Sequence, residues 1–219
     1  MMLFLLMIFV GTAMANPHPQ FVSLNEICPD IKIQMNYSTA DNFTGTIVSG
    51  YKAPIAYLAV NTAQALCEVQ KEATKRGYSL KIFDSYRPVK AVSFFQSWAK
   101  EPENNPSIKA LYYPRYTRED LFKLGFIATK SSHSRGSAVD LTLWDPKSGK
   151  NLDMGSGFDY FDDIAHTNSK LVTRSQNANR LLLKNLMEEQ GFKNFSQEWW
   201  HYSLKPELFP EEYFDFDVE

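Results

Sequence analysis

Residues 131–140 read SSHSRGSAVD, and the apolar run LTLW follows them directly. His133 and Asp140 are an odd number of residues apart, so on one continuous strand their side chains would point to opposite faces. Gly136, which has serines close by, permits a turn between them. We therefore expect a loop that carries His133, followed by a strand over 137–144 from which Asp140 faces the same point. An acidic side chain within such an apolar strand is costly to bury unless it is paired or binds a metal.

A second candidate stretch, QEWWHYSL, places Glu198 and His201 among aromatic residues. Two imidazoles and one carboxylate, from His133, Asp140 and His201, make a three-ligand set for Zn²⁺. A fourth position then stays open for water, as in a catalytic zinc site. Glu198 is in that case a nearby carboxylate that is not a ligand, and its natural task is to take a proton from the water. Taken singly, each residue is better explained as a hydrogen-bonded core or turn position, so it is the joint pattern that points to a metal.

The rest of the chain mixes strand and helix patterns and has no regular βαβ repeat. We expect strands over 31–39, 78–86, 137–144 and 192–204, and helices over 54–77, 88–100 and 174–191. The segment 101–114 is rich in Pro and Asn, which favours a surface loop. With no repeat and no low-complexity linker, the pattern predicts a single α+β domain with a mainly antiparallel sheet flanked by helices.

The composition is that of an ordinary globular protein, with 44% hydrophobic and 22% charged residues. The formal net charge of -2 gives no basic footprint, which argues against a nucleic-acid partner.

At the N-terminus, an unbroken apolar run over 2–10 and the small residues AMA at 13–15 have the layout of a secretory signal peptide, although no Lys or Arg precedes the run. We expect a signal peptide over 1–15, a mature domain over 16–219 and export, to the periplasm of a bacterium. The alternative for the run is a short uncleaved anchor. We expect no stable membrane span in the mature chain.

The two cysteines, Cys28 and Cys67, do not have the spacing of a metal site. In an exported chain they can pair as a disulfide, because the compartment is oxidising. The alternative is two buried free thiols.

Two motifs resemble those of a known family. SSHSRGSAVD matches S-x-H-x-x-G-x-A-x-D and EWWH matches E-x-x-H, the motifs of the zinc D,D-peptidases. The chain is most similar to the VanX-type D-alanyl-D-alanine dipeptidases, because DNFTG followed by GY, DSYRP and DMGSGFD fit that subgroup. The similarity runs from about residue 21 to about residue 204.

The resemblance implies the hedgehog-like fold of the zinc D,D-peptidases, one zinc ion per chain, and hydrolysis of the dipeptide D-Ala-D-Ala to two D-alanines. It assigns zinc binding to His133, Asp140 and His201, the general base to Glu198, stabilisation of the oxyanion to Arg87, and the substrate pocket to Ser131, Ser132 and Tyr51. The sequence around Arg87 agrees, because Pro88 ends the preceding strand pattern and strand ends are common places for sites. A surface arginine at a turn is the alternative for Arg87.

Two other functions stay open at this point. One is a peptidoglycan D,D- or L,D-carboxypeptidase of the same fold, which would act on longer peptides. The other is a non-catalytic zinc-binding module on that fold, against which the presence of both Glu198 and Arg87 argues.

Overall fold

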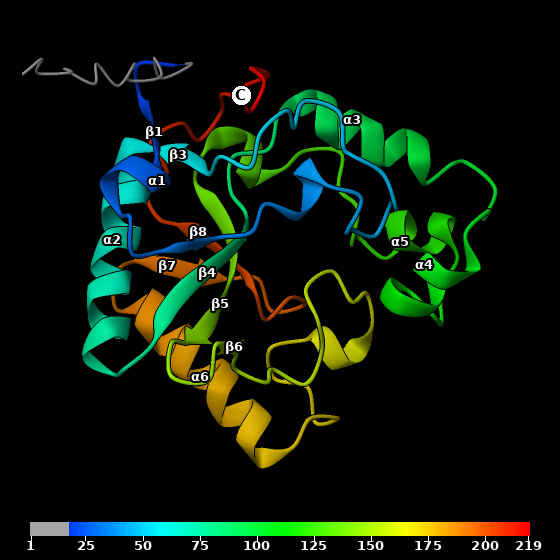
Figure 1. The fold of residues 1–219 in the computed structure, drawn as a ribbon. Coiled ribbons are helices and arrows are strands. Elements are labelled where there is room, and N and C mark those ends of the chain that lie inside the picture. Colours follow the sequence, from blue (N-terminus) through cyan, green and yellow to red (C-terminus); the bar gives the residue numbers. More distant parts are fainter. Residues whose placement is uncertain (1–17) are drawn as a thin grey trace, which may run out of the picture.

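The structure, a computed structural model, describes residues 18–219 (Figure 1). The predicted signal segment 1–15 lies outside the described residues. The strands are β1 (Phe21–Ser23), β2 (Lys32–Ile33), β3 (Tyr57–Ala59), β4 (Ser79–Asp84), β5 (Ala138–Asp145), β6 (Lys150–Asn151), β7 (Phe192–Asn194) and β8 (His201–Leu204). The α-helices are α1 (Leu24–Ile27), α2 (Val60–Lys75), α3 (Val89–Trp98), α4 (Pro106–Tyr112), α5 (Arg118–Lys123) and α6 (Arg174–Glu188). Short 3₁₀ helices are η1 (Asn36–Ser38), η2 (Ser132–Arg135) and η3 (Asp163–Ala165).

The main sheet has the strand order β2-β4-β5-β8-β7, and β6 pairs with β5. β5 lies between β4 and β8 and is antiparallel to both. The first six residues of β5 are all buried, which explains why its sequence is a nearly continuous apolar run. The pair β2–β4 is parallel, so the sheet is mixed, while the other described pairs are antiparallel. The expected α+β fold with a mainly antiparallel sheet is confirmed.

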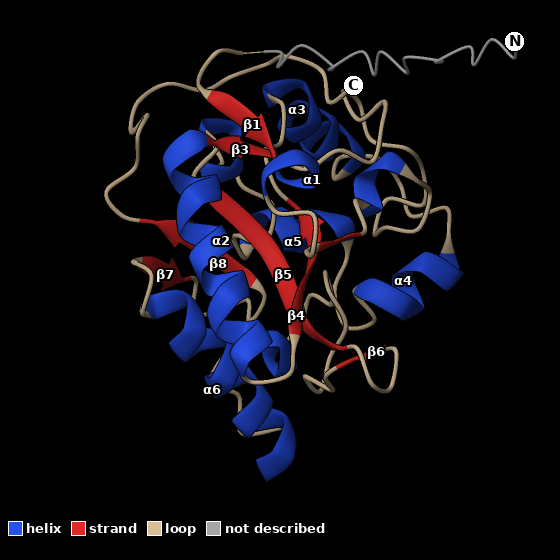
Figure 2. Cartoon of the chain, turned by 60° about the vertical axis from the view of Figure 1, so that its left-hand side comes forward, coloured by secondary structure: helices blue, strands red, loops and turns tan. Residues whose placement is uncertain are grey.

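Helices α2 and α6 lie side by side against one face of this sheet (Figure 2). The buried residues of α2 include Ala63, Leu66, Val69 and Ala73, which recur every three or four positions and form one apolar stripe. Helices α3, α4 and α5 gather on the far side of the sheet from this pair (Figure 1). The second face is therefore left to the loops and helices that surround the candidate site.

Several predicted elements have different bounds in the structure. The helix predicted over 54–77 begins only at Val60, because Tyr57–Ala59 pair with β1. The expected loop over 101–114 contains helix α4, which Asn105 caps by accepting a hydrogen bond from the backbone N–H of Ile108. The loop prediction was therefore wrong, since Asn and Pro here mark a helix start.

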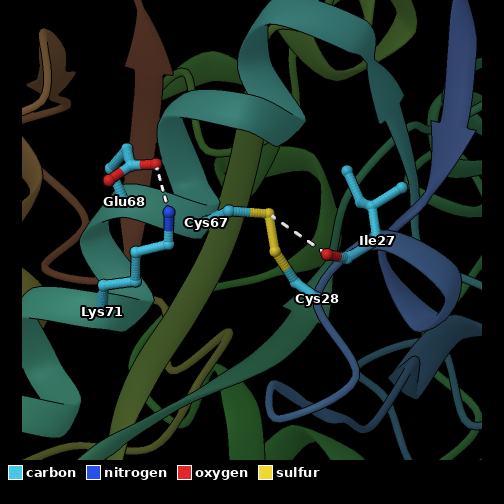
Figure 3. Close-up of a disulfide and its surroundings, with 5 residues drawn as sticks. All are labelled: Ile27, Cys28, Cys67, Glu68 and Lys71. Atoms are coloured by element: carbon cyan, nitrogen blue, oxygen red, sulfur yellow. Dashed lines mark hydrogen bonds and ion pairs between the residues drawn. A yellow bond between two sulfur atoms is a disulfide. The ribbon is translucent and has the colours of Figure 1, made fainter.

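A disulfide joins Cys28, at the end of α1, to Cys67 in α2 (Figure 3). The two Cα atoms are 5.9 Å apart, and 39 positions separate the cysteines in the chain. The predicted pairing is confirmed. It ties the N-terminal segment to the helix layer behind the sheet.

Within residues 18–219, every helix is too short or too polar to cross a bilayer.

Candidate active site

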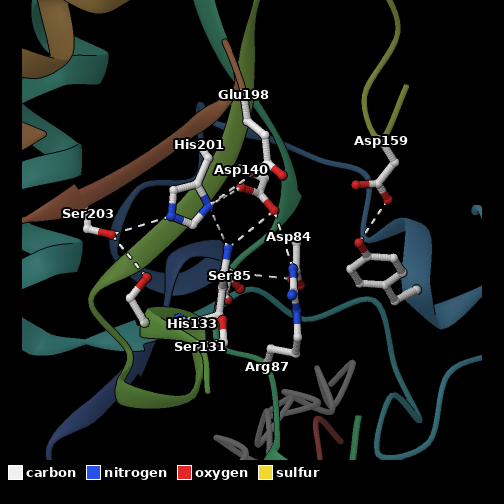
Figure 4. A network of polar contacts seen from close by, with 12 residues as sticks. Asp84, Ser85, Arg87, Ser131, His133, Asp140, Asp159, Glu198, His201 and Ser203 are labelled. Carbon is white, nitrogen blue, oxygen red and sulfur yellow. Dashed lines mark hydrogen bonds and ion pairs between the residues drawn. The ribbon is translucent and has the colours of Figure 1, made fainter. Parts of the chain in front are cut away.

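Three neighbouring strands bring Asp84, Asp140 and His201 into one row. Asp140 on β5 pairs in register with Asp84 on β4 and with His201 on β8. Directly opposite residues of antiparallel strands carry their side chains on the same face. The register of β4 shifts between Ile82 and Asp84, and such an irregularity re-aims the side chain that follows it. The polar row therefore points to one side of the sheet, where the contacts of Figure 4 are made.

His133 reaches this row from η2, the 3₁₀ helix just before β5. Gly136 ends η2 with φ = 69°, and an added Cβ there would lie 2.5 Å from Cε1 of Phe21, so the turn needs a glycine. The turn predicted from the sequence is confirmed. Nδ1 of His133 donates to the carbonyl oxygen of Ser85 at 2.6 Å, which leaves Nε2 as an electron-pair donor facing the row (Figure 4).

His133, Asp140 and His201 converge on one point. Nε2 of His133 lies 3.1 Å from Nδ1 of His201 and 3.3 Å from Oδ2 of Asp140, and Nδ1 of His201 lies 3.0 Å from Oδ1 of Asp140. Ligands at the roughly 2.0–2.2 Å typical of Zn–N and Zn–O bonds sit about this far from one another in a tetrahedral site. The two nitrogens and the carboxylate therefore fit a zinc ion, with one position left open.

Charge favours a cation at this point. Burial alone would raise the pKa of Asp140, but the adjacent His133 and His201 lower it below its ordinary value, so the carboxylate is ionised. Burial opposes the charging of His201, and its contact with Asp140 raises its pKa nonetheless. The arrangement is one in which a buried carboxylate attracts positive charge, from a proton or from a metal.

Glu198 lies beside His201, one of the three side chains that could hold a metal ion. Its backbone N–H donates to the carbonyl oxygen of Phe195 at 3.0 Å, and its own carbonyl oxygen accepts from the N–H of His201 at 3.3 Å. This double turn separates β7 from β8, so the single strand predicted over 192–204 is divided into two. Oε2 of Glu198 is 3.9 Å from Nδ1 of His201. Burial, together with the charge of Asp140, raises the pKa of Glu198 to about 7, a value suited to a group that both takes and gives a proton near neutral pH.

Arg87 lies on the other side of the row, at the end of β4. Its Nε and Nη2 are 2.9 and 2.8 Å from Oδ2 of Asp84, and Nη2 is 3.5 Å from Oδ2 of Asp140 (Figure 4). The guanidinium also lies over the rings of Tyr37 and Phe95, 5.2 and 5.4 Å from their centroids. Burial disfavours its charge, but the neighbouring Asp84 raises its pKa above the ordinary value. The cation is therefore held in one orientation.

Two of the three residues expected in the pocket line the cavity, and the third does not. Ser131 and Ser132 line the cavity. Tyr51 does not; it is buried behind the cavity, where its hydroxyl donates to Oδ1 of Asp84 at 2.6 Å. Tyr51 thus supports the carboxylate that holds Arg87, and the resemblance alone could not separate a residue at the pocket from one behind it.

The cavity at this site has a volume of about 190 Å³. Its polar walls are Arg87, Lys130, Ser131, Ser132, His133, Asp140, Asp159, Glu198 and His201, and its aromatic walls are Tyr37, Phe43, Phe95, Phe126, Phe161 and Phe195. This volume is below the roughly 300–1,000 Å³ of pockets for drug-sized ligands. The site is therefore built for a small molecule.

The cavity residues that sequence reasoning missed include Tyr37 and Asp159. The hydroxyl of Tyr37 donates to Oδ2 of Asp159 at 2.8 Å. Asp159 is buried and has φ = 56°, an uncommon left-handed conformation for a residue other than glycine. Burial and the nearby Asp140 raise its pKa well above the ordinary value. Asp159 ends the stretch DMGSGFD, which could have drawn attention to it, whereas nothing in the sequence marks Tyr37.

Comparisons with known proteins show the family of this chain. The family model described as D-ala-D-ala dipeptidase (Peptidase M15) matches residues 18–219. D-alanyl-D-alanine dipeptidase of Enterococcus faecium is 41% identical over 91% of this chain and 98% of its own length. The enzyme of that name from Escherichia coli K12 is 35% identical over 84% of each chain. In the solved structures, a mutant of the vancomycin resistance D,D-pentapeptidase VanY in complex with Zn(II) is similar with a TM-score of 0.40 and 16% identity, over 68% of this chain and 73% of that chain, which is too remote to bear on the site. On its family match and its identity to these dipeptidases, this chain belongs to the D-ala-D-ala dipeptidase family of peptidases.

Proposed function

We propose that this chain is a zinc-dependent dipeptidase that hydrolyses D-alanyl-D-alanine to two D-alanines. The observation that carries the proposal is the convergence of three metal-ligand side chains, a carboxyl group with a pKa near neutral and a fixed arginine in one small cavity. The relatives named D-alanyl-D-alanine dipeptidase support the substrate.

His133, Asp140 and His201 would hold one zinc ion per chain, in the geometry described above. A zinc ion there supplies a Lewis acid and lowers the pKa of bound water. A test on the protein itself is the zinc content of the purified mature chain. We expect about one ion per chain, and a His201→Ala variant with both less zinc and less activity; full zinc in that variant would remove His201 from the ligand set.

Glu198 acts as the proton carrier. As a carboxylate it takes a proton from the attacking water, and as an acid it passes that proton to the leaving amine. A pKa near the working pH lets one carboxyl group serve first as the base and then as the acid. Arg87, which Asp84 holds in place, lies where its positive charge stabilises the negative oxygen that forms on the attacked carbonyl carbon.

The two ends of a dipeptide need opposite partners. The buried carboxyl of Asp159, whose partner in the cavity wall is the hydroxyl of Tyr37, offers an acceptor for the free ammonium group. At the cavity wall, Oγ of Ser131 accepts the N–H of His133 at 3.2 Å, so its own O–H is free to donate to the free carboxylate. Ser132 is paired with Ser203 at 3.1 Å and supports this wall.

The deciding experiment is incubation of the purified mature protein with D-Ala-D-Ala and, separately, with a peptidoglycan pentapeptide that ends in D-Ala-D-Ala. We expect release of D-alanine from the dipeptide only, because a cavity of about 190 Å³ has room for a small substrate. Release from the pentapeptide would select the carboxypeptidase. Release from neither, in a zinc-loaded protein, would select the non-catalytic zinc module.

We further propose that residues 1–15 direct export and are removed, so that the mature chain begins at Asn16. The apolar run and the small residues before Asn16 support this, as does the disulfide, which an oxidising compartment favours. The N-terminal sequence of the protein recovered from a bacterial periplasm tests it. A chain recovered only from the cytoplasm with residues 1–15 intact would contradict the proposal.

A further inference from the structure

Residues 213–219, here called the C-terminal strap, cross the loops that carry the candidate active site. The strap has little regular structure, yet Phe214 and Val218 are buried. Phe214 packs against Phe21 and Phe209, with ring centroids 5.0 Å apart in both cases. A loose surface segment would leave such side chains exposed, so the strap is a fixed part of the fold.

The main chain of Phe214 joins the two loops that carry opposite sides of the site. Its N–H donates to the carbonyl oxygen of Ser134 at 2.8 Å, and its carbonyl oxygen accepts from the N–H of Val89 at 3.1 Å. Ser134 follows the proposed ligand His133, and Val89 lies two residues after Arg87. The N–H of Arg87 donates to the carbonyl oxygen of His133 at 3.3 Å. The strap thus closes a ring of hydrogen bonds around the pair His133 and Arg87.

The next strap residues hold the Arg87 loop from both sides. The ring of Phe216 stacks on that of Tyr86 with centroids 4.1 Å apart, and the hydroxyl of Tyr86 donates to the carbonyl oxygen of Phe216 at 3.0 Å. Oδ1 of Asp215 accepts the N–H of Lys90 at 2.7 Å, which caps the start of α3. The residues before and after Arg87 therefore each have a partner in the strap.

The far end of the strap reaches the segment behind the site. The N–H of Val218 donates to the carbonyl oxygen of Gly50 at 2.8 Å, and its carbonyl oxygen accepts from the N–H groups of Lys52 and Ala53, both at 2.9 Å. Between these residues lies Tyr51, whose hydroxyl holds Asp84, the partner of Arg87. The strap contacts the support of Arg87 as well as its loop.

We infer that the C-terminal strap is a positioning element that sets the distance between Arg87 and the proposed metal ligand His133. The inference rests on the proposed function, in which Arg87 stabilises the transition state beside the metal. A displacement of about 1 Å at such a group can lower the rate about 10²-fold. A segment without any residue in the cavity would therefore control kcat.

The test is a truncated protein that ends at Tyr213, compared with the full chain in the presence of zinc. We expect kcat for D-Ala-D-Ala to fall about 10–10²-fold with zinc still bound at about one ion per chain, because the strap removes none of the three ligands. In an Arg87→Ala background the same truncation should change kcat very little, since the strap then has no arginine to position. Equal losses in both backgrounds, an unchanged kcat in the folded truncated protein, or loss of zinc would each overturn the inference.

A milder variant keeps the test decisive if the truncated protein does not fold. Asp215→Ala removes one contact at an exposed strap position, the cap on Lys90, and should lower kcat a few-fold in the Arg87 background alone. Glu212→Ala, at an exposed position with no described side-chain contact to the site loops, is the matched control and should leave kcat unchanged. A kcat for Asp215→Ala equal to that of the control would overturn the inference.

Hydrogen exchange separates this inference from the proposed function. If the full-length protein with zinc does not hydrolyse D-Ala-D-Ala, the proposed function fails, but the amides over 85–90 and 131–137 should still exchange more slowly in the full chain than in the Asp215→Ala or truncated protein. Equal exchange rates in those two segments would overturn the strap as a positioning element.

Discussion

Two arginines of this protein, Arg87 and Arg180, lie in surroundings of opposite character. Arg87 faces the cavity and is paired with the carboxylate of Asp84, which raises its pKa. Arg180 on α6 is fully buried, and its Nε and Nη1 donate to the backbone carbonyl oxygens of Met154 and His166 at 2.6 and 2.7 Å. Burial lowers the pKa of Arg180 to about 10.

The difference separates an arginine with a proposed catalytic role, Arg87, from one that fixes the backbone, Arg180. Arg87 keeps a face toward the cavity and takes its partner from a side chain, so its charge is available to a substrate. Arg180 donates its hydrogen bonds to carbonyl groups of the segment 154–166, which contains Asp159. It thereby joins that segment to the helix layer. A substitution at the first position should therefore change catalysis, and one at the second should change stability.

The largest effect is expected at Glu198, on the catalytic side of the comparison. Glu198→Gln keeps the shape and removes no proposed ligand, so zinc content and fold should stay unchanged. We expect kcat to fall by about 10²–10⁴-fold, as for the loss of a general acid–base group. Steady-state kinetics with metal analysis checks this. Zinc loss would make Glu198 a ligand, and activity close to that of the parent would place the base elsewhere.

Arg87→Lys should come next in size. A lysine keeps the charge but cannot present two N–H groups to Asp84 in a fixed plane, so the cation loses its orientation. We expect a loss of about 10²–10³-fold in kcat, as for removal of one donor from an oxyanion site. The measurement is kcat and KM for D-Ala-D-Ala at full zinc loading. If only KM changed, Arg87 would bind the ground state, and its proposed role would be wrong.

Arg180→Met should destabilise the fold and leave the chemistry in place. Two buried carbonyl groups lose their donors, which predicts a decrease of about 2–4 kcal/mol in the free energy of unfolding. Arg174→Met, at an exposed position on the same helix, is the control and should have little effect. Urea unfolding measures the change. A stable Arg180→Met protein with a large decrease in kcat would break the distinction drawn between the two arginines.

A third arginine, Arg135, gives the smallest expected effect, and it depends on pH. Its Nη2 is 2.9 Å from Oε1 of Glu207. Burial would raise the pKa of Glu207, but hydrogen bonds from Arg135, Lys205 and Ser137 lower it from 4.5 to about 2. A lowered folded-state pKa means that this contact stabilises the protein above pH 4.5 and that the contribution is lost as pH falls toward 2.

The urea midpoint of Glu207→Gln should accordingly be below that of the parent above pH 4.5, and the difference should shrink as pH falls through this window. Glu212→Gln, at an exposed position, serves as the reference. A difference that stayed constant with pH would mean that packing, and not the charge of Glu207, holds this contact.

The sequence predicted that His133 and Asp140 face the same point because local rules apply to the turn between them. The turn at Gly136 follows from spacing and strand geometry and was found, whereas a turn before His201 divides the strand predicted over 192–204. The strand predicted over 31–39 is much shorter in the structure: only Lys32–Ile33 pair with β4, and Asn36–Ser38 form a 3₁₀ helix. The alternation of apolar and polar residues is visible in the sequence, whereas the point at which pairing with the neighbouring strand stops is not.

The missed residues depend on long-range packing. Tyr37 and Asp159 are hydrogen-bonded across 122 positions of sequence, and neither has a pattern that points to the other. Asp84 stands inside the quoted stretch DSYRP, yet its place in the polar row depends on the register shift in β4. Tyr51 was expected in the pocket but lies behind it. A motif identifies a residue of the site, but it does not say whether the side chain lines the cavity or supports its wall.

The row formed by Asp84, Asp140 and His201 has a consequence for how the protein matures. These residues come from distant parts of the chain and meet only when β4, β5 and β8 pair in the correct register. A slip of one residue in β5 or β8 would turn that strand over and carry Asp140 or His201, two of the proposed metal ligands, to the opposite face. A misaligned molecule would then be unable to retain the ion, and metal binding adds its free energy to the correctly paired state alone. Among newly made chains, only those with correctly paired strands would thus retain the metal. The fraction of chains that contain metal would therefore measure the fraction that has folded correctly, without any assay of activity.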